Sequence, residues 1–94
     1  MGQLMLMVKY QTKPQTRASF VDEVVSAGIL EKIYQEDGFI SYRYYYDAAD
    51  PDCLLLIEEW ESERQQQAHL QTEHMRMLKD IKEKYVLETS VRKL

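Results

Sequence analysis

The segment CLLLIEEW, residues 53–60, constrains the fold of this chain more than any other part of it. Its apolar run predicts an extended strand. Side chains of a strand alternate between two faces, so one face carries Leu54, Leu56, Glu58 and Trp60, and the other carries Cys53, Leu55, Ile57 and Glu59. Both faces are apolar over most of their length, which is typical of a strand that is covered on both sides.

Three further strands are predicted around this segment. The aromatic, β-favouring stretch FISYRYYYD (39–47) lies just before it, and the turn sequence AADPD separates the two, which predicts an antiparallel hairpin. LMLMVKYQ (4–11) near the N-terminus and the alternating YVLETSVRKL (85–94) at the C-terminus predict the other two strands.

A pair of helices is predicted between the first strand and the hairpin. Phe20, Val24 and Ala27 recur at helical spacing, and Gly28 interrupts the pattern. Residues 29–34 continue as a second short helix, for which Gly38 is the expected C-terminal cap.

A second pair of helices is predicted after Trp60. Ser62 and Gln65 have the spacing of a capping box, so a helix is expected to begin directly after the strand. Thr72 is a second cap that divides the following stretch into two helical pieces, the second with an apolar face of Met75, Leu78 and Ile81.

The order strand, helix pair, strand, strand, helix pair, strand predicts an α+β, ferredoxin-like domain with an antiparallel sheet over residues 1–94. Helices cover only one face of such a sheet. Since residues 53–60 are apolar on both faces, we expect a second copy of the chain to cover the other face, giving a two-fold homodimer.

Charge and cysteine content exclude several classes of protein. The net charge is −4 and no cluster of Lys or Arg is present, which argues against a nucleic-acid partner. Cys53 is the only cysteine, so an internal disulfide is impossible and a reducing compartment is favoured. We therefore expect a cytoplasmic protein without a membrane partner.

The stretch IEEWESERQQQAHLQTEH (57–74) contains the residues that are able to carry chemistry. Glu58 faces inward from a strand, where a carboxylate requires a partner. His69 is a candidate general base, because an unperturbed imidazole titrates at roughly pH 6.5. His69 and Trp60 also have an ordinary interpretation, as a hydrogen-bonded histidine and a core aromatic.

A metal site is not expected. His69 and His74 are five residues apart, which on one continuous helix separates them by roughly 140° and prevents joint binding of one ion. With one cysteine and no further histidine, a structural zinc site is excluded as well.

The tyrosines of residues 39–47 also divide between two faces. Tyr42, Tyr44 and Tyr46 share one face, while Arg43 and Tyr45 point to the other. If several of them line a cavity between sheet and helices, the cavity suits a planar aromatic or quinone-like ligand. We expect such a cavity to have a volume of a few hundred Å³.

The stretches GFISYRYYYD, LLLIEEWESERQQQAHLQTEHM and VLETSVRKL resemble the antibiotic biosynthesis monooxygenase domain family, including its small stand-alone quinol-monooxygenase-like members. Glu58-x-Trp60, His69 and His74 stand in the family's order and spacing. The resemblance implies a dimeric α/β barrel and the oxidation of a small aromatic or hydroquinone by O₂ without metal or flavin. Haem-cleaving members use an Asn, a Trp and a His, and this chain contains no Asn.

The resulting hypothesis is a cofactor-independent monooxygenase of a small hydroxylated aromatic or quinol. His69 would accept the phenolic proton, and Glu58 would orient or tune His69. The substrate would lie against Trp60, Tyr42, Tyr44 and His74. Two alternatives remain open: an isomerase or lyase of a small carbonyl compound of the autoinducer type, and a non-catalytic ligand-binding dimer module.

Overall fold

The computed structural model describes residues 3–94. Over this range the helices and strands follow the predicted order. They are β1 (Leu4–Thr12), α1 (Arg17–Ser26), α2 (Ile29–Ile33), β2 (Phe39–Tyr46), β3 (Cys53–Trp60), α3 (Glu63–His69), α4 (Glu73–Tyr85) and β4 (Val86–Lys93). The predicted α+β, ferredoxin-like fold is confirmed.

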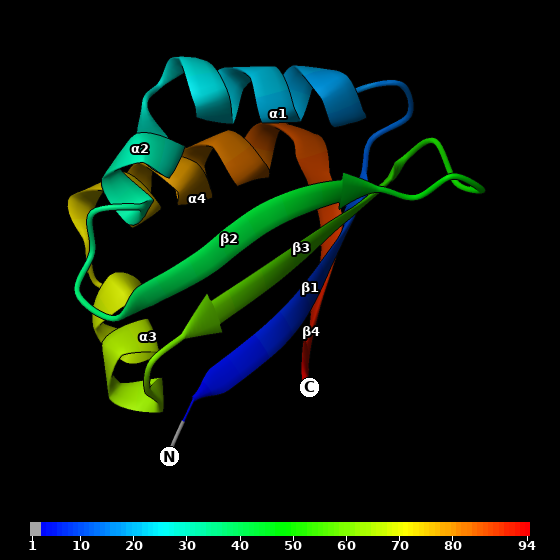
Figure 1. Ribbon diagram of the computed structural model, residues 1–94. Coiled ribbons are helices and arrows are strands. Elements are labelled where there is room, and N and C mark those ends of the chain that lie inside the picture. The colour runs from blue at the N-terminus through cyan, green and yellow to red at the C-terminus, as the bar shows by residue number, and fades with distance from the viewer. Residues whose placement is uncertain (1–2) are drawn as a thin grey trace.

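The strands form one antiparallel sheet with the order β2-β3-β1-β4. β1 and β3 therefore lie in the centre, and β2 and β4 are the edges. Figure 1 shows α1, α2 and α4 stacked over one face of this sheet, with α3 at the end of β3. Since β3 is a central strand, one of its faces lies in the middle of the helix-covered side of the sheet, and its other face lies in the middle of the uncovered side.

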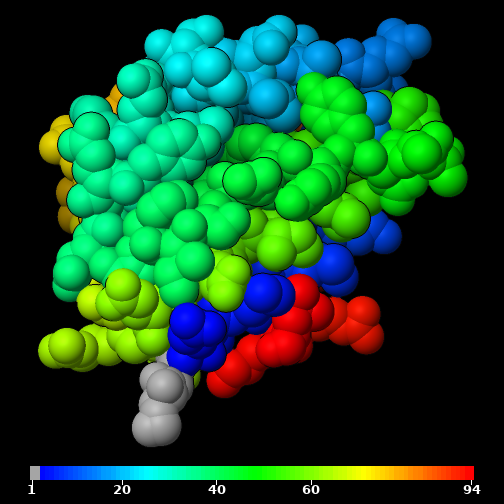
Figure 2. Space-filling model, viewed as in Figure 1, coloured from blue at the N-terminus to red at the C-terminus, as the bar shows by residue number. Residues whose placement is uncertain are grey.

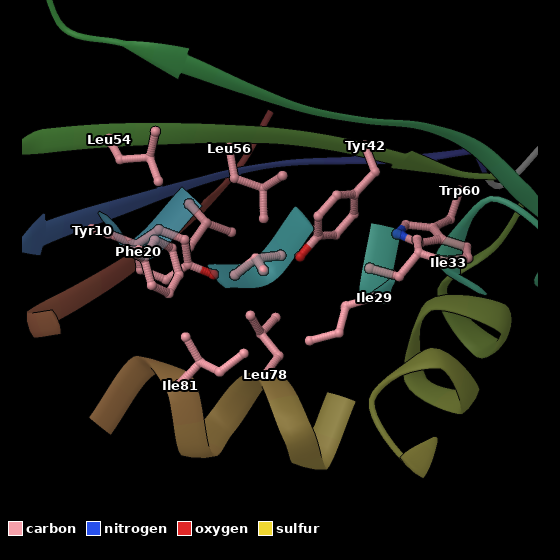
Figure 3. Packing of buried hydrophobic residues seen from close by; sticks show 12 residues of the cluster. Tyr10, Phe20, Ile29, Ile33, Tyr42, Leu54, Leu56, Trp60, Leu78 and Ile81 are labelled. Atoms are coloured by element: carbon pink, nitrogen blue, oxygen red, sulfur yellow. The ribbon is translucent and has the colours of Figure 1, made fainter. Parts of the chain in front are cut away.

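The core lies between the sheet and the helices. Leu54, Leu56 and Trp60 of β3 are at most 1% exposed and point toward the helices, where they meet Ile29, Leu78 and their neighbours (Figure 3). The predicted inward face of residues 53–60 is therefore confirmed. In the space-filling view α1 and α2 lie along the upper side of β2, whose side chains are visible in front, while the end of β4 (red) lies at the lower edge (Figure 2).

Both predicted caps of the second helix pair are present. The Ser62 hydroxyl accepts a hydrogen bond from the backbone N–H of Gln65 at 3.2 Å, and the Thr72 hydroxyl accepts one from Met75 at 3.4 Å. These caps start α3 and α4 as separate helices. His69 consequently ends one helix, and His74 lies in the first turn of the next.

Two predicted boundaries were wrong. Gly38 does not cap α2, which ends at Ile33; it adopts a φ of +82° in the turn that leads into β2. Tyr85 was assigned to the last strand, but it is the final residue of α4. Its ring packs beside Phe20, with 6.3 Å between the centroids, and its hydroxyl donates a hydrogen bond to Glu23; both contacts join distant segments, so the local alternation does not reveal them.

The face of the sheet away from the helices remains partly apolar. Leu55 and Ile57 of β3 are half-buried there, and Met5 and Tyr45 on this side are 36% and 48% exposed. None of the helices formed by residues 3–94 covers this face (Figure 1). In the same range, every helix is too short or too polar to cross a membrane.

Candidate active site

A cavity of about 550 Å³ lies between the helix-facing side of the sheet and the helices α3 and α4. Its volume falls within the range of small-ligand sites. All four strands contribute to one wall, β2 through Tyr42, and the two helices supply the other. Its lining includes Leu6, Tyr10, Tyr42, Glu58, Lys79 and Lys82.

Glu58 lies in the wall of this cavity. It is 6% exposed, and it pairs across the sheet with Leu6 of β1 and Tyr42 of β2. Burial raises the pKa of the Glu58 carboxyl above its ordinary value, and this rise is partly offset by a hydrogen bond from Trp60 and by the nearby charge of His69. Burial thus shifts the equilibrium of the Glu58 carboxyl toward its protonated form, compared with a carboxyl in water.

Trp60 supports Glu58 from the same face of β3. Its indole N–H donates a hydrogen bond to Glu58 Oε1 at 2.8 Å. The indole is fully buried, 4.5 Å from the His69 ring and 5.9 Å from Phe39 between ring centroids. Trp60 does not itself line the cavity, so its position allows it to hold Glu58 rather than to touch a ligand in this cavity.

His69 is buried behind the cavity wall. Its Nδ1 lies 2.9 Å from Glu36 Oε2, and its ring is 5.9 Å from the Tyr42 ring. Its Nε2 is buried and has no hydrogen-bond partner among residues 3–94. A buried polar atom without a partner is rare enough to call for an explanation. His69 is not part of the cavity lining.

Glu36 is the residue that sequence reasoning missed. It lies in the loop between α2 and β2, and its Oε2 accepts hydrogen bonds from both His69 Nδ1 at 2.9 Å and His74 Nε2 at 2.6 Å. No local pattern in the sequence connects these residues, because Glu36 precedes the two histidines by 33 and 38 positions. Only the fold brings the loop against the junction of α3 and α4.

This cluster overturns the geometric premise from which joint binding of one ion by His69 and His74 was excluded. That argument assumed a continuous helix, whereas the chain breaks between α3 and α4 and turns both rings toward Glu36. The three ligand-type atoms lie within 4.8 Å of one another. Tetrahedral zinc ligands lie roughly 3.3 Å apart, so the separations of 2.6 and 2.9 Å fit a hydrogen-bonded cluster.

The tyrosines of β2 differ in their surroundings. Tyr42 is 3% exposed and lines the cavity, while the buried hydroxyl of Tyr44 has no hydrogen-bond partner among the described residues. Tyr44 packs edge-on against Phe20 and Tyr42 and lies outside this cavity. Burial raises the pKa of both hydroxyls well above 10, so both keep their protons at neutral pH.

His74 lies outside the cavity lining as well. Besides Glu36, its Nε2 lies 3.2 Å from the Thr72 hydroxyl. Of the six predicted site residues, the structure thus places Glu58 and Tyr42 in the cavity wall. Trp60 and His69 lie directly behind it, and Tyr44 and His74 lie farther along the sheet and the helix junction.

Sequence comparisons relate this chain to known proteins. The family described as antibiotic biosynthesis monooxygenase matches residues 3–80. The protein named "probable quinol monooxygenase YgiN" from Escherichia coli (strain K12) is 31% identical over 99 residues, with 95% of this chain and 93% of that protein covered.

Solved structures share the fold. A conserved protein from Methanosarcina mazei Go1 matches with a TM-score of 0.87 at 23% identity, covering 100% of this chain and 92% of that one. PA3566 from Pseudomonas aeruginosa matches with a TM-score of 0.86 at 19% identity, covering 100% and 93%. At these identities the likeness concerns the fold alone.

Proposed function

The chain belongs to the antibiotic biosynthesis monooxygenase family, and on that premise we propose that it oxidises a small hydroxylated aromatic or quinol with O₂. The proposed reaction uses no metal and no organic cofactor. A deprotonated quinol is electron-rich enough to react with O₂ directly, so the protein needs to supply a base, a binding cavity and protection from water.

Glu58 is the observation that carries this proposal. It is the buried carboxylate in the wall of a cavity of about 550 Å³, and its pKa is raised by burial. A base is most effective when its pKa approaches the working pH. Glu58 therefore accepts the phenolic proton in our proposal, and the neighbouring Tyr42 hydroxyl donates a hydrogen bond to the substrate oxygen.

The proposal exchanges the roles expected from the sequence. Glu58, rather than His69, lies where a ligand can touch it. His69 acts as a positioning residue: it packs 4.5 Å from Trp60, which holds Glu58, and it is itself held by Glu36. The charge of His69 opposes the rise in the pKa of Glu58 and so favours the ionised carboxylate, which is the form that acts as a base.

The chemistry balances without another reactant. A quinol and O₂ give a hydroxyquinone and water: the ring carbon gains one oxygen atom, and the second oxygen atom leaves as water. All four electrons come from the quinol. The apolar side chains that share the cavity with Glu58, among them Leu6 and Leu78, exclude water from the reactive intermediate.

Oxygen uptake over a panel of quinols tests the proposal. We expect Glu58→Gln to lower kcat by about 10²–10⁴-fold, because the general base is lost while the hydrogen bond from Trp60 is kept. The matched control is Glu61→Gln, which removes an exposed carboxylate just beyond β3. His69→Gln should move the acidic limb of the pH profile upward, since His69 lowers the pKa of Glu58.

Two results would contradict the proposal. Equal oxygen uptake by wild type and Glu58→Gln would remove Glu58 from the mechanism. Turnover of a small carbonyl compound that persists without oxygen, with no quinol consumed above the protein-free rate, would favour the isomerase or lyase instead.

We also propose that the protein is a homodimer that buries the sheet face opposite the helices. Half-buried Leu55 and Ile57 in the centre of that face, with exposed Met5 and Tyr45 beside them, support this arrangement. Contiguous apolar surface of this kind is typical of protein interfaces.

A further inference from the structure

Three lysines line the cavity. Lys79 and Lys82 lie three residues apart on α4 and therefore on one face of that helix, and Lys93 projects from β4. Within residues 3–94, none of the three forms an ion pair. Lys84, two residues after Lys82 on α4, does pair with Glu23.

Lys82 differs from an ordinary surface lysine. It is half-buried, and burial lowers the pKa of its ammonium group. Its Nζ lies 5.0 Å from the centre of the Tyr10 ring, which also lines the cavity. A cation that is partly removed from water beside an aromatic face is stabilised by a neighbouring anion. Lys79 and Lys93 are exposed, so solvation alone accounts for them.

The acidic groups of the cavity are Glu58 on the sheet and Glu63 at the start of α3. Lys82 Nζ lies beside Tyr10, which is four positions along β1 from Leu6, the cross-strand partner of Glu58, so the backbones of Tyr10 and Leu6 are roughly 13 Å apart. Lys93 also pairs with Leu6 and therefore lies at the level of Glu58, on the other side of β1. Apolar side chains lie between the two ends, including Leu6, Val8 and Leu78. The cavity thus has a carboxylate at one side, an apolar middle and the ammonium group of Lys82 at the other side.

We propose that the ligand of this cavity carries an acidic group, a carboxylate or a phosphate, which binds at Lys82 with Lys79 on the same face of α4. The hydroxyl group of the same ligand faces Glu58, and the aromatic ring occupies the apolar middle. This inference rests on the proposed function and specifies its substrate class: a hydroxylated aromatic acid rather than a neutral quinol.

Calorimetric binding without oxygen tests the inference independently of turnover. The probes are 2,5-dihydroxybenzoate, its neutral methyl ester and 4-hydroxyphenyl phosphate. We expect the better of the two anions to bind about tenfold more tightly than the ester at low salt. The ratio of the affinities for the carboxylate probe and the phosphate probe then identifies the acidic group that the cavity prefers. The preference should shrink as salt is raised, because added ions screen the lysines.

Variants assign the preference to the lysines. Lys82→Met keeps the length of the side chain and should abolish most of the preference for the anion, while Lys82→Arg should retain it. Lys79→Met should reduce it less, because Lys79 is exposed. The control is Lys32→Met, which removes an exposed lysine of α2 that does not border the cavity. Circular dichroism of each variant establishes that it is folded.

Equal affinity for acid and ester, or an anion preference that survives in folded Lys82→Met and Lys79→Met proteins, would overturn the inference. Neither result bears on whether neutral quinols are oxidised. Conversely, an anion preference that depends on Lys82, together with no oxygen uptake for any quinol, would support this inference and contradict the proposed oxidation.

Discussion

The indole N–H of Trp60 donates a hydrogen bond of 2.8 Å to the carboxylate of Glu58, two residues earlier on the same face of β3. Strand geometry makes this contact possible, because side chains at i and i+2 project in the same direction. The bond occupies Oε1 of Glu58 and leaves Oε2 without a protein partner among residues 3–94. A fully buried indole thus fixes a carboxylate at the cavity wall.

Glu58→Gln should make the protein more stable at neutral pH. The pKa of Glu58 is raised in the folded state, so the folded protein favours the protonated carboxyl. The stability that this carboxyl contributes is fully present below its unfolded pKa of about 4.3 and is lost as the pH rises through the folded pKa. We expect a Tm about 2–5 °C higher than wild type at pH 8, and a smaller gain at pH 4.

The comparison uses Glu61→Gln, whose exposed carboxyl should leave the Tm unchanged at both values of pH. Thermal unfolding followed by circular dichroism measures the effect. A Tm gain of Glu58→Gln over wild type that is smaller at pH 8 than at pH 4 would contradict the assigned direction of the pKa shift.

Glu36→Ala should destabilise the protein. Glu36 accepts hydrogen bonds from His69 and His74, and its removal leaves the fully buried His69 Nδ1 without a partner. An unpartnered buried donor costs about 1–3 kcal/mol in the free energy of unfolding. Urea unfolding measures this loss, and Glu31→Ala, at an exposed position of α2, provides the baseline. A loss no larger than that of the baseline would show that the cluster does not stabilise the fold.

Gly38→Ala should be more destabilising than Gly28→Ala. Both glycines have positive φ, +82° and +74°, so alanine is strained at either position. A Cβ at Gly38 would also overlap the side chain of Gln65, whereas a Cβ at Gly28 meets no atom within 4 Å. We expect losses of about 2–4 kcal/mol and about 1 kcal/mol in the free energy of unfolding. Gln65 is bonded to Ser62, so its displacement also weakens the cap of α3. Similar losses for both variants would contradict the overlap.

Ile57→Lys should separate the proposed homodimer into monomers. Ile57 lies half-buried at the centre of the sheet face away from the helices, and a buried ammonium group without a partner opposes association. Light scattering at micromolar concentration should give the mass of two chains for wild type and of one chain for the variant. Val25→Lys, at a 53% exposed position of α1, should remain dimeric. A monomeric wild type would refute the dimer.

The sequence by itself determined the order of elements and the inward side of β3. These features depend on neighbouring residues: the alternation from Cys53 to Trp60, the caps at Ser62 and Thr72, and the interruption at Gly28 all act over a few positions. The strand period of two also put Glu58 and Trp60 on the inward face of β3, and the structure confirms that placement. It grouped Tyr42 with Tyr44 on one face of β2 but left open which side of the sheet that face is on.

The tertiary structure alone decided which of these residues meet. Glu36 reaches His69 and His74 across 33 and 38 positions, because a loop folds against a helix junction. The same packing leaves a cavity between the sheet and α3 and α4, with Glu58 in its wall and Lys82 at its border, and buries His69 behind it. Residue spacing fixes the direction of a side chain within its own element. Contacts between elements depend on how helices and loops pack, and packing is not encoded in any local pattern.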